Sequence, residues 1–206
     1  MAGRDGKRPA NLTGCISDRL GLNRRATEYR TAARRRTYGI ASLDNYTMTA
    51  FPVDPLPDIE EFSSLLAIWD AKRDGAQLPL KSAFDIEDFG GWLGRIAISE
   101  WEDGDCRFRL FGTQFVDLLG RDLTGELLCE SLMPDLVEPS KRHFAELRYG
   151  SRIGHTTGYV PVPGREFIAF NVLDLPLWDA HSQVGFFLHG LVVGGPVRDM
   201  ETPDRT

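Results

Sequence analysis

Four histidines are the side chains of this chain best suited to hold a ligand or to move a proton: His143, His155, His181 and His189. Histidine changes charge near neutral pH, and its neutral imidazole binds haem iron and other metals. A haem would be held from His143, which lies on a predicted helix, but no second residue stands at a spacing that supports a ligand pair. His189 lies in an otherwise apolar run and is predicted to be a hydrogen-bonded core or pocket residue.

Acidic residues cluster at Glu87-Asp88, at Glu100 and at Glu102-Asp103-Gly104-Asp105. Paired carboxylates can perform acid–base chemistry or bind calcium. These clusters coincide with predicted turns and strand ends and lack an EF-hand pattern, so we expect them to be solvated. Catalytic motifs of the GxSxG, phosphate-loop and HExxH types are absent from the sequence. We therefore predict no catalytic residue and no metal site.

Cysteine usage indicates a reducing compartment. The chain has three cysteines, Cys15, Cys106 and Cys129, which are widely spaced and form no CxxC pair. An odd number with this spacing argues against a disulfide framework and against a zinc site. The sequence therefore predicts a cytoplasmic protein.

The charge of the chain is distributed unevenly. The first 47 residues contain 10 Lys or Arg against 4 Asp or Glu, and the remainder contains 14 against 26. The net charge of −6 therefore divides into +6 and −12. Because nucleic-acid affinity depends on neutralising phosphates, the acidic part is a poor candidate for that function. No apolar stretch approaches the roughly 20 residues of a membrane span.

The sequence divides into a tail and one domain. Residues 1–56 are rich in Arg, Thr, Ser, Asn and Gly and show no sustained period, so they bury too little apolar area to offset their ordering entropy. We predict a disordered basic tail there, with the alternative that translation starts at Met48. A folded domain over 57–196 and a short C-terminal tail over 197–206 complete the predicted organisation.

An amphipathic helix is predicted over 58–73. Asp58 and Glu61 have the spacing of a capping box at its start, and Gly75 can end it in a left-handed conformation. One face of this helix carries apolar residues at i, i+3, i+4 and i+7, namely Phe62, Leu65, Leu66 and Trp69. Such a stripe must be covered by another part of the protein.

Five strands are predicted, over 95–101, 106–112, 155–162, 166–174 and 184–193. A hairpin turn at Asp103-Gly104-Asp105 joins the first two. Pro161 and Pro163 indicate either that the third strand lies at a sheet edge or that it ends at these residues, because proline cannot donate a hydrogen bond to a ladder. Short helices and a longer helix over 139–149, beginning at Pro139, lie between the second and third strands.

The last two predicted strands are apolar on both sides, which indicates that both of their faces are covered. Helices between the second and third strands can cover one face. The helix over 58–73 can cover the other, either within the chain or from a second copy in a dimer.

This order of elements resembles that of a PAS domain, and so do two stretches of sequence. The first is Leu65-Leu66-Ala67-Ile68-Trp69-Asp70 with Arg73-Asp74-Gly75 and Leu78-Pro79, and the second is Phe108-Arg109-Leu110-Phe111-Gly112-Thr113 with Leu119-Gly120-Arg121-Asp122-Leu123-Thr124-Gly125. They are similar to an alphaproteobacterial single-domain PAS family formerly classed as a domain of unknown function. The resemblance covers about 57–196 and departs from the family pattern over 80–88.

The resemblance implies an α+β fold with a five-stranded antiparallel sheet of order 2-1-5-4-3. Helices would lie on one face, an N-terminal amphipathic helix would be added, and 184–193 would be the central strand.

The second stretch also has a structural explanation that does not need the resemblance. Gly112 permits a tight exit from its strand, and Thr113 can cap the helix that follows. Gly120 can end that helix, and Asp122 can satisfy backbone donors in the next turn. The complete structural motif is Gly112, Thr113, Gly120, Arg121, Asp122, Thr124 and Gly125.

A ligand pocket is expected between the sheet and its helices. Its candidate residues, chosen from placement alone, are Phe108, Phe115, Leu119, Leu132, Phe144, Tyr159, Phe170 and His189, and the alternative is that they fill the core. Some PAS domains hold haem or flavin. The letters Cys106-Arg107-Phe108 partly match the Asn-Cys-Arg-Phe flavin motif but begin a predicted strand. No cofactor is predicted, with haem and flavin as weaker alternatives.

These observations predict a non-enzymatic bacterial module for sensing or protein interaction. It would act on an unknown signalling protein, because only about ten residues follow the last strand, and it would be gated by a small apolar ligand and dimerise through the helix over 58–73. The second hypothesis is a small enzyme or ligand carrier on a curved-sheet α+β fold, with Glu166 and His189 as nearest candidates. The third is contact of the Arg-rich tail with nucleic acid or an anionic membrane.

Overall fold

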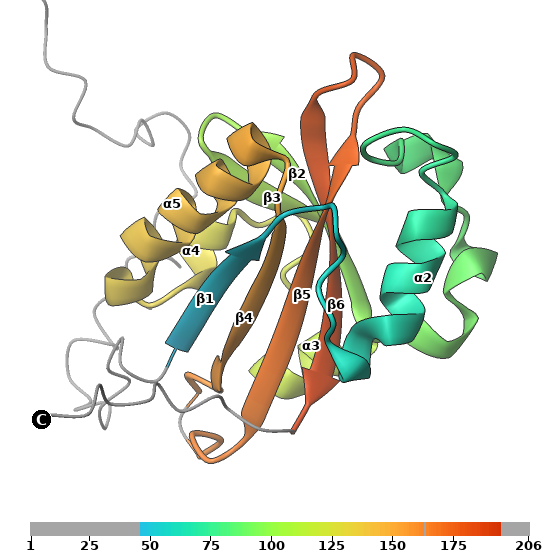
Figure 1. The fold of residues 1–206 in the computed structure, drawn as a ribbon. Helices are drawn as coiled ribbons and strands as arrows, with labels where there is room; N and C mark the ends of the chain where they lie inside the picture. Colours follow the sequence, from blue (N-terminus) through green and yellow to red (C-terminus); the bar gives the residue numbers. More distant parts are fainter. Residues whose placement is uncertain (1–45, 163, 195–206) are drawn as a thin grey trace, which may run out of the picture. The chain divides into compact units, whose positions relative to one another are not determined.

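The computed structural model describes residues 46–162 and 164–194, which form one antiparallel sheet and the helices packed on it (Figure 1). In chain order the elements are β1 (Tyr46–Phe51), η2 (Glu60–Phe62), α2 (Ser63–Ala71), η3 (Lys81–Ala83), η4 (Ile86–Trp92), β2 (Ile96–Glu102), β3 (Asp105–Phe111), α3 (Thr113–Leu119), α4 (Leu128–Ser131), α5 (Pro134–Gly150), β4 (Ile153–Tyr159), β5 (Ala169–Trp178) and β6 (Val184–Val193).

The described sheet has six strands in the order β1-β4-β5-β6-β2-β3. The predicted strand number of five is therefore wrong, and the order differs from the predicted one because β1 adds an edge strand beside β4. The other five strands run β3-β2-β6-β5-β4. The α+β class and the antiparallel pairing agree with the sequence prediction.

Strand β1 lies inside the stretch 1–56, for which the sequence predicts no stable structure, so that prediction is wrong for residues 46–51. The six residues of β1 are uncharged and include Thr, Tyr and Phe, which favour strands. The hydroxyl of Tyr46 donates to the backbone oxygen of Tyr159 at 2.8 Å, at the far end of β4. Residues 52–56 of the predicted tail are also described, and Val53 among them is buried. Residues 1–45 and 195–206, on which the remaining tail predictions fall, lie outside the described residues.

Because β1 pairs with it, β4 is an internal strand and not an edge. The sequence predicts either that this strand lies at an edge or that it ends at its prolines. The second alternative is correct for Pro161, which comes after Tyr159, the last residue of β4. Pro163 lies outside the described residues.

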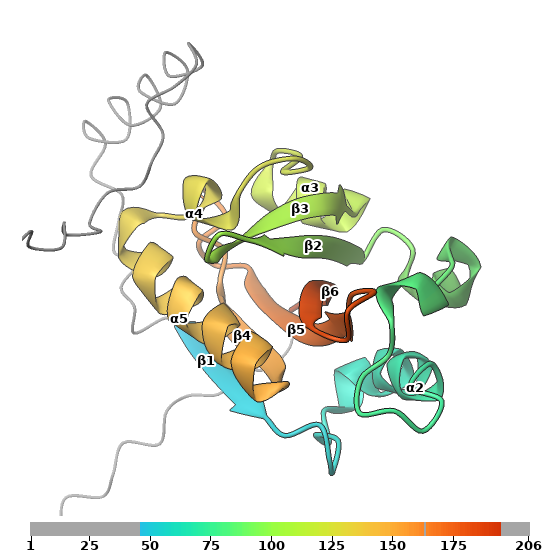
Figure 2. The same ribbon diagram turned by 90° about the horizontal axis from the view of Figure 1, so that it is seen from above.

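Strand β6 lies between β5 and β2, and helices cover both of its faces (Figures 1 and 2). On one face, Phe187 and His189 contact Phe144 of α5, with ring centroids 5.2 and 5.9 Å apart. On the other, a Cβ added to Gly190 would collide with the side chain of Leu65 at the start of α2. The two-sided apolarity of this strand thus corresponds to two-sided burial.

The apolar stripe of α2 is buried within the chain. Phe62, Leu65 and Trp69 are 0% exposed and Leu66 is 5% exposed, and Trp69 Nε1 donates to the oxygen of Pro176 at 3.1 Å. The stripe therefore covers the sheet, as one of the two sequence alternatives has it, and these four residues are not available for a contact between two copies. The predicted capping box at Asp58 and Glu61 does not form, because the chain enters α2 through the 3₁₀ turn η2.

Helix α5 begins at Pro134, five residues before the predicted start. Pro134 takes the first helical position, where the missing N–H is not needed, and Pro139 lies inside the helix. None of the helices in the described part of the chain combines the length and the apolarity that a membrane crossing requires.

Candidate functional site

A cluster of four polar side chains lies inside the fold, between the sheet and α5. It consists of Ser99 on β2, His189 on β6, Asp174 on β5 and His143 on α5, and none of them is more than 7% exposed. Ser99 Oγ lies 2.8 Å from His189 Nε2, and His189 Nδ1 lies 2.7 Å from Asp174 Oδ1. The second carboxylate oxygen of Asp174 lies 3.7 Å from His143 Nε2. We call these four residues the polar cluster.

Strand register brings three members of the polar cluster together. Asp174 and His189 are direct partners in the β5–β6 ladder, so their side chains project from neighbouring strands on the same face. Ser99 is the partner of Phe187 in the β2–β6 ladder, two residues before His189, which makes Ser99 and His189 diagonal neighbours. The hydrogen bonds therefore cross three adjacent strands.

The fourth member reaches the sheet because of a glycine. Gly154 is the partner of Asp174 in the β4–β5 ladder. A Cβ added to Gly154 would lie 2.8 Å from His143 Nε2 and 2.6 Å from a methyl carbon of Leu147, closer than side chains can pack. The bare backbone at Gly154 thus lets α5 approach the sheet and brings His143 to Asp174.

The carboxyl group of Asp174 is ionised despite its burial. Burial raises the pKa of Asp174, but the nearby imidazole of His143 and the hydrogen bond with His189 act in the opposite direction and leave the pKa below its ordinary value. An ionised carboxylate accepts the hydrogen bond from the Nδ1–H of His189, whose Nε2 then accepts the hydroxyl proton of Ser99. The cluster is therefore a continuous hydrogen-bonded path from β2 to β5.

The path from Ser99 through His189 to Asp174 has the hydrogen-bond pattern of a Ser-His-Asp triad. Ser99 is 0% exposed, however, and a nucleophile must touch its substrate. Cys106, next to Ser99 in space, is also buried, and burial raises the pKa of its thiol far above the ordinary value, so the thiol is protonated. The arrangement suits hydrogen bonding within the core better than attack on a substrate.

Aromatic rings frame the polar cluster. The rings of Phe108 and Phe144 lie 5.8 and 5.9 Å from the ring of His189, measured between centroids. These three were among the residues chosen from the sequence as pocket candidates, and they do meet in space. Asp174 and Ser99 were missed, although a charged residue between Leu173 and Leu175 in a strand buried on both faces was a usable signal.

The other pocket candidates lie elsewhere. Phe115, Leu119 and Phe170 pack in a neighbouring apolar cluster that also includes Phe108. Leu132 is half-buried at the end of α4 and belongs to neither core cluster, and Tyr159 is 38% exposed at the end of β4.

Glu166 and His189, the pair considered for an enzyme, are not brought together. Glu166 is exposed and accepts a hydrogen bond from the backbone of Gly164, whereas His189 is buried. His181 is exposed in the β5–β6 turn. Cys106 lies on strand β3 and not on a helix, so the partial match to a flavin motif falls in the wrong kind of element.

One acidic residue predicted to be solvated is buried instead. Asp105 is 7% exposed, and its two carboxylate oxygens accept hydrogen bonds from the backbone N–H groups of Cys106 and Cys129, at 2.7 and 3.2 Å. The prediction is therefore wrong for Asp105, whose role is to join β3 to α4.

The motif residues act on the backbone. Gly112 leaves no room for a Cβ, which would collide with the backbone oxygens of Gly94 and Ile96. Gly120 ends α3 with φ 75°, and Asp122 Oδ1 accepts hydrogen bonds from the N–H and hydroxyl of Thr124. Arg121 donates a hydrogen bond to the backbone oxygen of Ser131, and the backbone oxygen of Gly125 accepts one from Arg107. Thr113 is the first residue of α3, which begins without a side-chain cap.

Known proteins that are similar to this chain include a domain family and a solved structure. The family model described as PAS domain matches residues 59–188. A solved structure described as an RNA-binding light-oxygen-voltage receptor is similar with a TM-score of 0.40 and 12% sequence identity, covering 71% of this chain and 38% of that chain. No curated protein matches this sequence.

Proposed function

We propose that this chain, which belongs to the PAS domain family, is a sensory or interaction module whose state is set at the polar cluster. PAS domains are typically modules of this kind. The observation that carries the proposal is the buried hydrogen-bonded path formed by Ser99, His189 and Asp174, with His143 beside it. Polar networks in an apolar core are costly unless they are satisfied, so their state strongly affects the structure around them.

The signal that fits this site is a small, largely apolar molecule with one hydrogen-bonding group. The rings of Phe108 and Phe144 would contact its apolar part, and Ser99 or His189 would engage its polar group. Such a molecule would compete for a hydrogen bond inside the cluster and change the contacts of His143 with Asp174. A ligand without a polar group would leave the cluster unchanged.

Helix α5 is the element best placed to pass this change to a partner protein. It carries His143 on the side facing the sheet, and Tyr149 near its C-terminal end is 80% exposed. Between these two positions, Arg148 donates to the oxygen of Val184 and its guanidinium stacks 5.3 Å from the ring of Trp101. A shift of α5 would therefore change the position of the exposed Tyr149 ring. It would also change the contacts that attach α5 to β2 and β6.

Hydrogen–deuterium exchange tests this coupling. In Ser99→Ala, which leaves His189 Nε2 without its partner, we expect faster exchange along α5 as well as in β2 and β6. The matched control is Ser64→Ala, which removes the hydroxyl that accepts from Trp92 Nε1 at 3.0 Å, outside the cluster. Faster exchange in Ser99→Ala that spares α5, or equal effects of both variants on α5, would show that the cluster is only a packing feature.

Native mass spectrometry and an absorption spectrum of freshly purified protein test for the ligand itself. A copurifying molecule held beside His189 should be lost in Phe108→Trp, whose larger side chain would occupy the place proposed for that molecule. The same mass measurement reports the oligomeric state. A dimer would have to form through a surface other than the buried stripe of α2.

A small hydrolytic enzyme is the second candidate, favoured by the triad-like pattern of Ser99, His189 and Asp174. An organophosphonate probe that reacts with activated serines distinguishes the two functions. We expect no labelling of Ser99, because its hydroxyl is fully buried. Stoichiometric labelling that is lost in Ser99→Ala would replace the sensory proposal by the enzymatic one.

A further inference from the structure

His143 is the member of the polar cluster whose hydrogen bonding is incomplete. Its Nε2 lies 3.7 Å from Asp174 Oδ2, too far for a hydrogen bond. This buried nitrogen has no other hydrogen-bond partner within residues 46–162 and 164–194. A buried polar atom without a partner costs free energy. The cluster is therefore complete on the side of His189 and incomplete on the side of His143.

A proton on His143 would complete the cluster. One oxygen of Asp174 is engaged by His189, and the other, Oδ2, is directed to His143. A protonated imidazole donates from both ring nitrogens, and its hydrogen bond to a carboxylate is short, at about 2.7–2.9 Å. Uptake of a proton by His189 would instead cost the hydrogen bond that its Nε2 accepts from Ser99. The added proton is therefore best placed on His143.

The groups packed around His143 favour a positive charge there. Asp174 on β5 is ionised, because its pKa lies below the ordinary value. Strands β4 and β1 face His143 with Gly154 and its ladder partner Ala50, neither of which titrates. At 7% exposed, His143 is also the most exposed of the four cluster residues, so it is the member that a proton from solvent reaches first.

The other titratable groups near α5 do not compete for Asp174. The thiol of Cys106 on β3 is protonated, because burial raises its pKa. The charged side chains on α5 and on the elements packed against it are exposed or bonded to other partners, namely Asp105, Glu130, Arg142, Glu146, Arg148 and Arg152. Among the residues that the structure describes, Asp174 is the acidic group at ion-pair distance from His143.

We propose that His143 is a proton switch of the polar cluster, which on protonation closes onto Asp174 and draws α5 toward the sheet. The proposal rests on the proposed function, because it names a regulator for the same site. The ring of His143 packs against Phe144, with centroids 5.6 Å apart, and against the bare backbone of Gly154, so ring and helix move together. Histidine changes charge between about pH 5 and 8, which sets the range of the switch.

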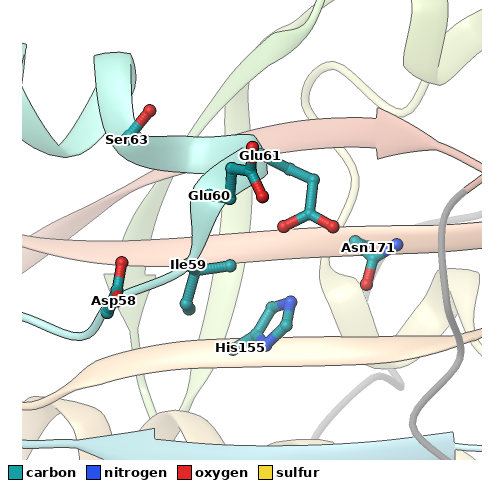
Figure 3. Close-up of a pocket in the computed structure, with 7 residues that line it drawn as sticks. All are labelled: Asp58, Ile59, Glu60, Glu61, Ser63, His155 and Asn171. Carbon is teal, nitrogen blue, oxygen red and sulfur yellow. The ribbon is translucent and has the colours of Figure 1, made fainter.

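A pH titration of the ¹⁵N-labelled full chain by NMR, from about pH 8 to about pH 5, tests the switch. We expect both ring nitrogens of His143 to reach the shifts of protonated nitrogens, and the amides of residues 140–147 to move with the same midpoint. His155 is an internal reference, because it lies beside Ile59 and Asn171 on the opposite face of the sheet (Figure 3). The α5 amides should follow the midpoint of His143 and not that of His155.

In His143→Gln, whose amide can donate to Asp174 but cannot take up a proton, the pH-dependent shifts of α5 should disappear. The matched control is His181→Gln, which removes an exposed histidine from the β5–β6 turn and should leave these shifts unchanged. If His143→Gln does not fold, the ring nitrogens of the wild type decide alone. A His143 that stays neutral down to about pH 5, or α5 shifts that persist in His143→Gln, would overturn the proposal.

The exchange experiment on Ser99→Ala separates this proposal from the sensory one. If His143 does not titrate but Ser99→Ala still speeds exchange along α5, the proton switch fails and the sensory proposal stands. If Ser99→Ala spares α5, the sensory proposal fails, and the switch fails with it because it has no cluster to regulate.

Discussion

Replacement of Asp174 by Asn tests whether the polar cluster is held together by an ionised carboxylate. Asn has nearly the same shape, so packing against Gly154 and the neighbouring strand is retained. The change removes the negative charge that faces His189 at 2.7 Å and His143 at 3.7 Å. It also replaces one of the two accepting carboxylate oxygens by an NH₂ group, which donates hydrogen bonds and does not accept them.

The expected cost is large because all three side chains are buried. Leaving a buried donor without its acceptor typically costs about 1–3 kcal/mol, and more where the lost partner is charged. For a urea dependence of about 2 kcal/mol per M, the unfolding midpoint should fall by at least about 0.5–1.5 M. This loss is a substantial fraction of a total stability of about 5–15 kcal/mol.

The pH dependence gives the sharper signature. The pKa of Asp174 is lowered in the folded state, so its contribution is fully present above the pKa of the unfolded chain, about 3.9, and is lost as the pH falls through the folded value. The part of the stability difference between the wild type and Asp174→Asn that comes from this carboxylate should therefore shrink as the pH falls below about 3.9.

Urea unfolding followed by tryptophan fluorescence at pH 7, 5 and below 3.8 measures both effects. The matched control is Asp74→Asn, because Asp74 is exposed with φ 48°, a conformation that Asn also tolerates. A midpoint of Asp174→Asn within about 0.5 kcal/mol of the wild type at pH 7 would refute the reasoning. So would a deficit that is unchanged in acid.

Three further substitutions test how the sheet is covered. Gly190→Ala places a methyl group against Leu65 and should destabilise the domain by about 1–3 kcal/mol, as overpacking does, with the midpoint of urea unfolding as the measure. Gly112→Ala collides with backbone oxygens that cannot move aside, so its midpoint should fall below that of Gly190→Ala; the reverse order would contradict this account. Trp69→Phe removes the hydrogen bond to Pro176 and some ring area and should cost about 1–2 kcal/mol, whereas no loss would show that this bond adds nothing.

The sequence predicts the elements that have a strong internal period. The stripe of Phe62, Leu65, Leu66 and Trp69 repeats at helical spacing, and the two-sided apolarity of β6 reports its central position. Both patterns arise from burial, which acts on the amino-acid types themselves. Strand β1 was missed for the corresponding reason: all six of its residues are half-buried, so its two faces do not differ enough to leave an alternating pattern.

The polar cluster shows the limit of reasoning from local sequence. Ser99, His143, Asp174 and His189 are far apart along the chain, and only strand register and the close approach of α5 at Gly154 bring them together. His189 was recognisable as a satisfied core residue, and Asp174 only as a charged residue in an apolar strand. Residues that depend on the pairing of distant strands carry no signal in a local window, apart from being polar in an apolar surrounding.

Glycines at two ladder positions explain how one sheet can be covered closely on both faces. Gly154 admits His143 and Leu147 on the side of α5, and Gly190 admits Leu65 on the side of α2. Gly190 is the partner of Leu173, the residue just before Asp174, and Gly154 is the partner of Asp174 itself, so the two contacts meet on adjacent residues of β5. A displacement of α5 that moves Asp174 must therefore also strain the contact between Gly190 and α2. If the polar cluster responds to a signal, its effect should reach both faces of the sheet through this short segment of β5.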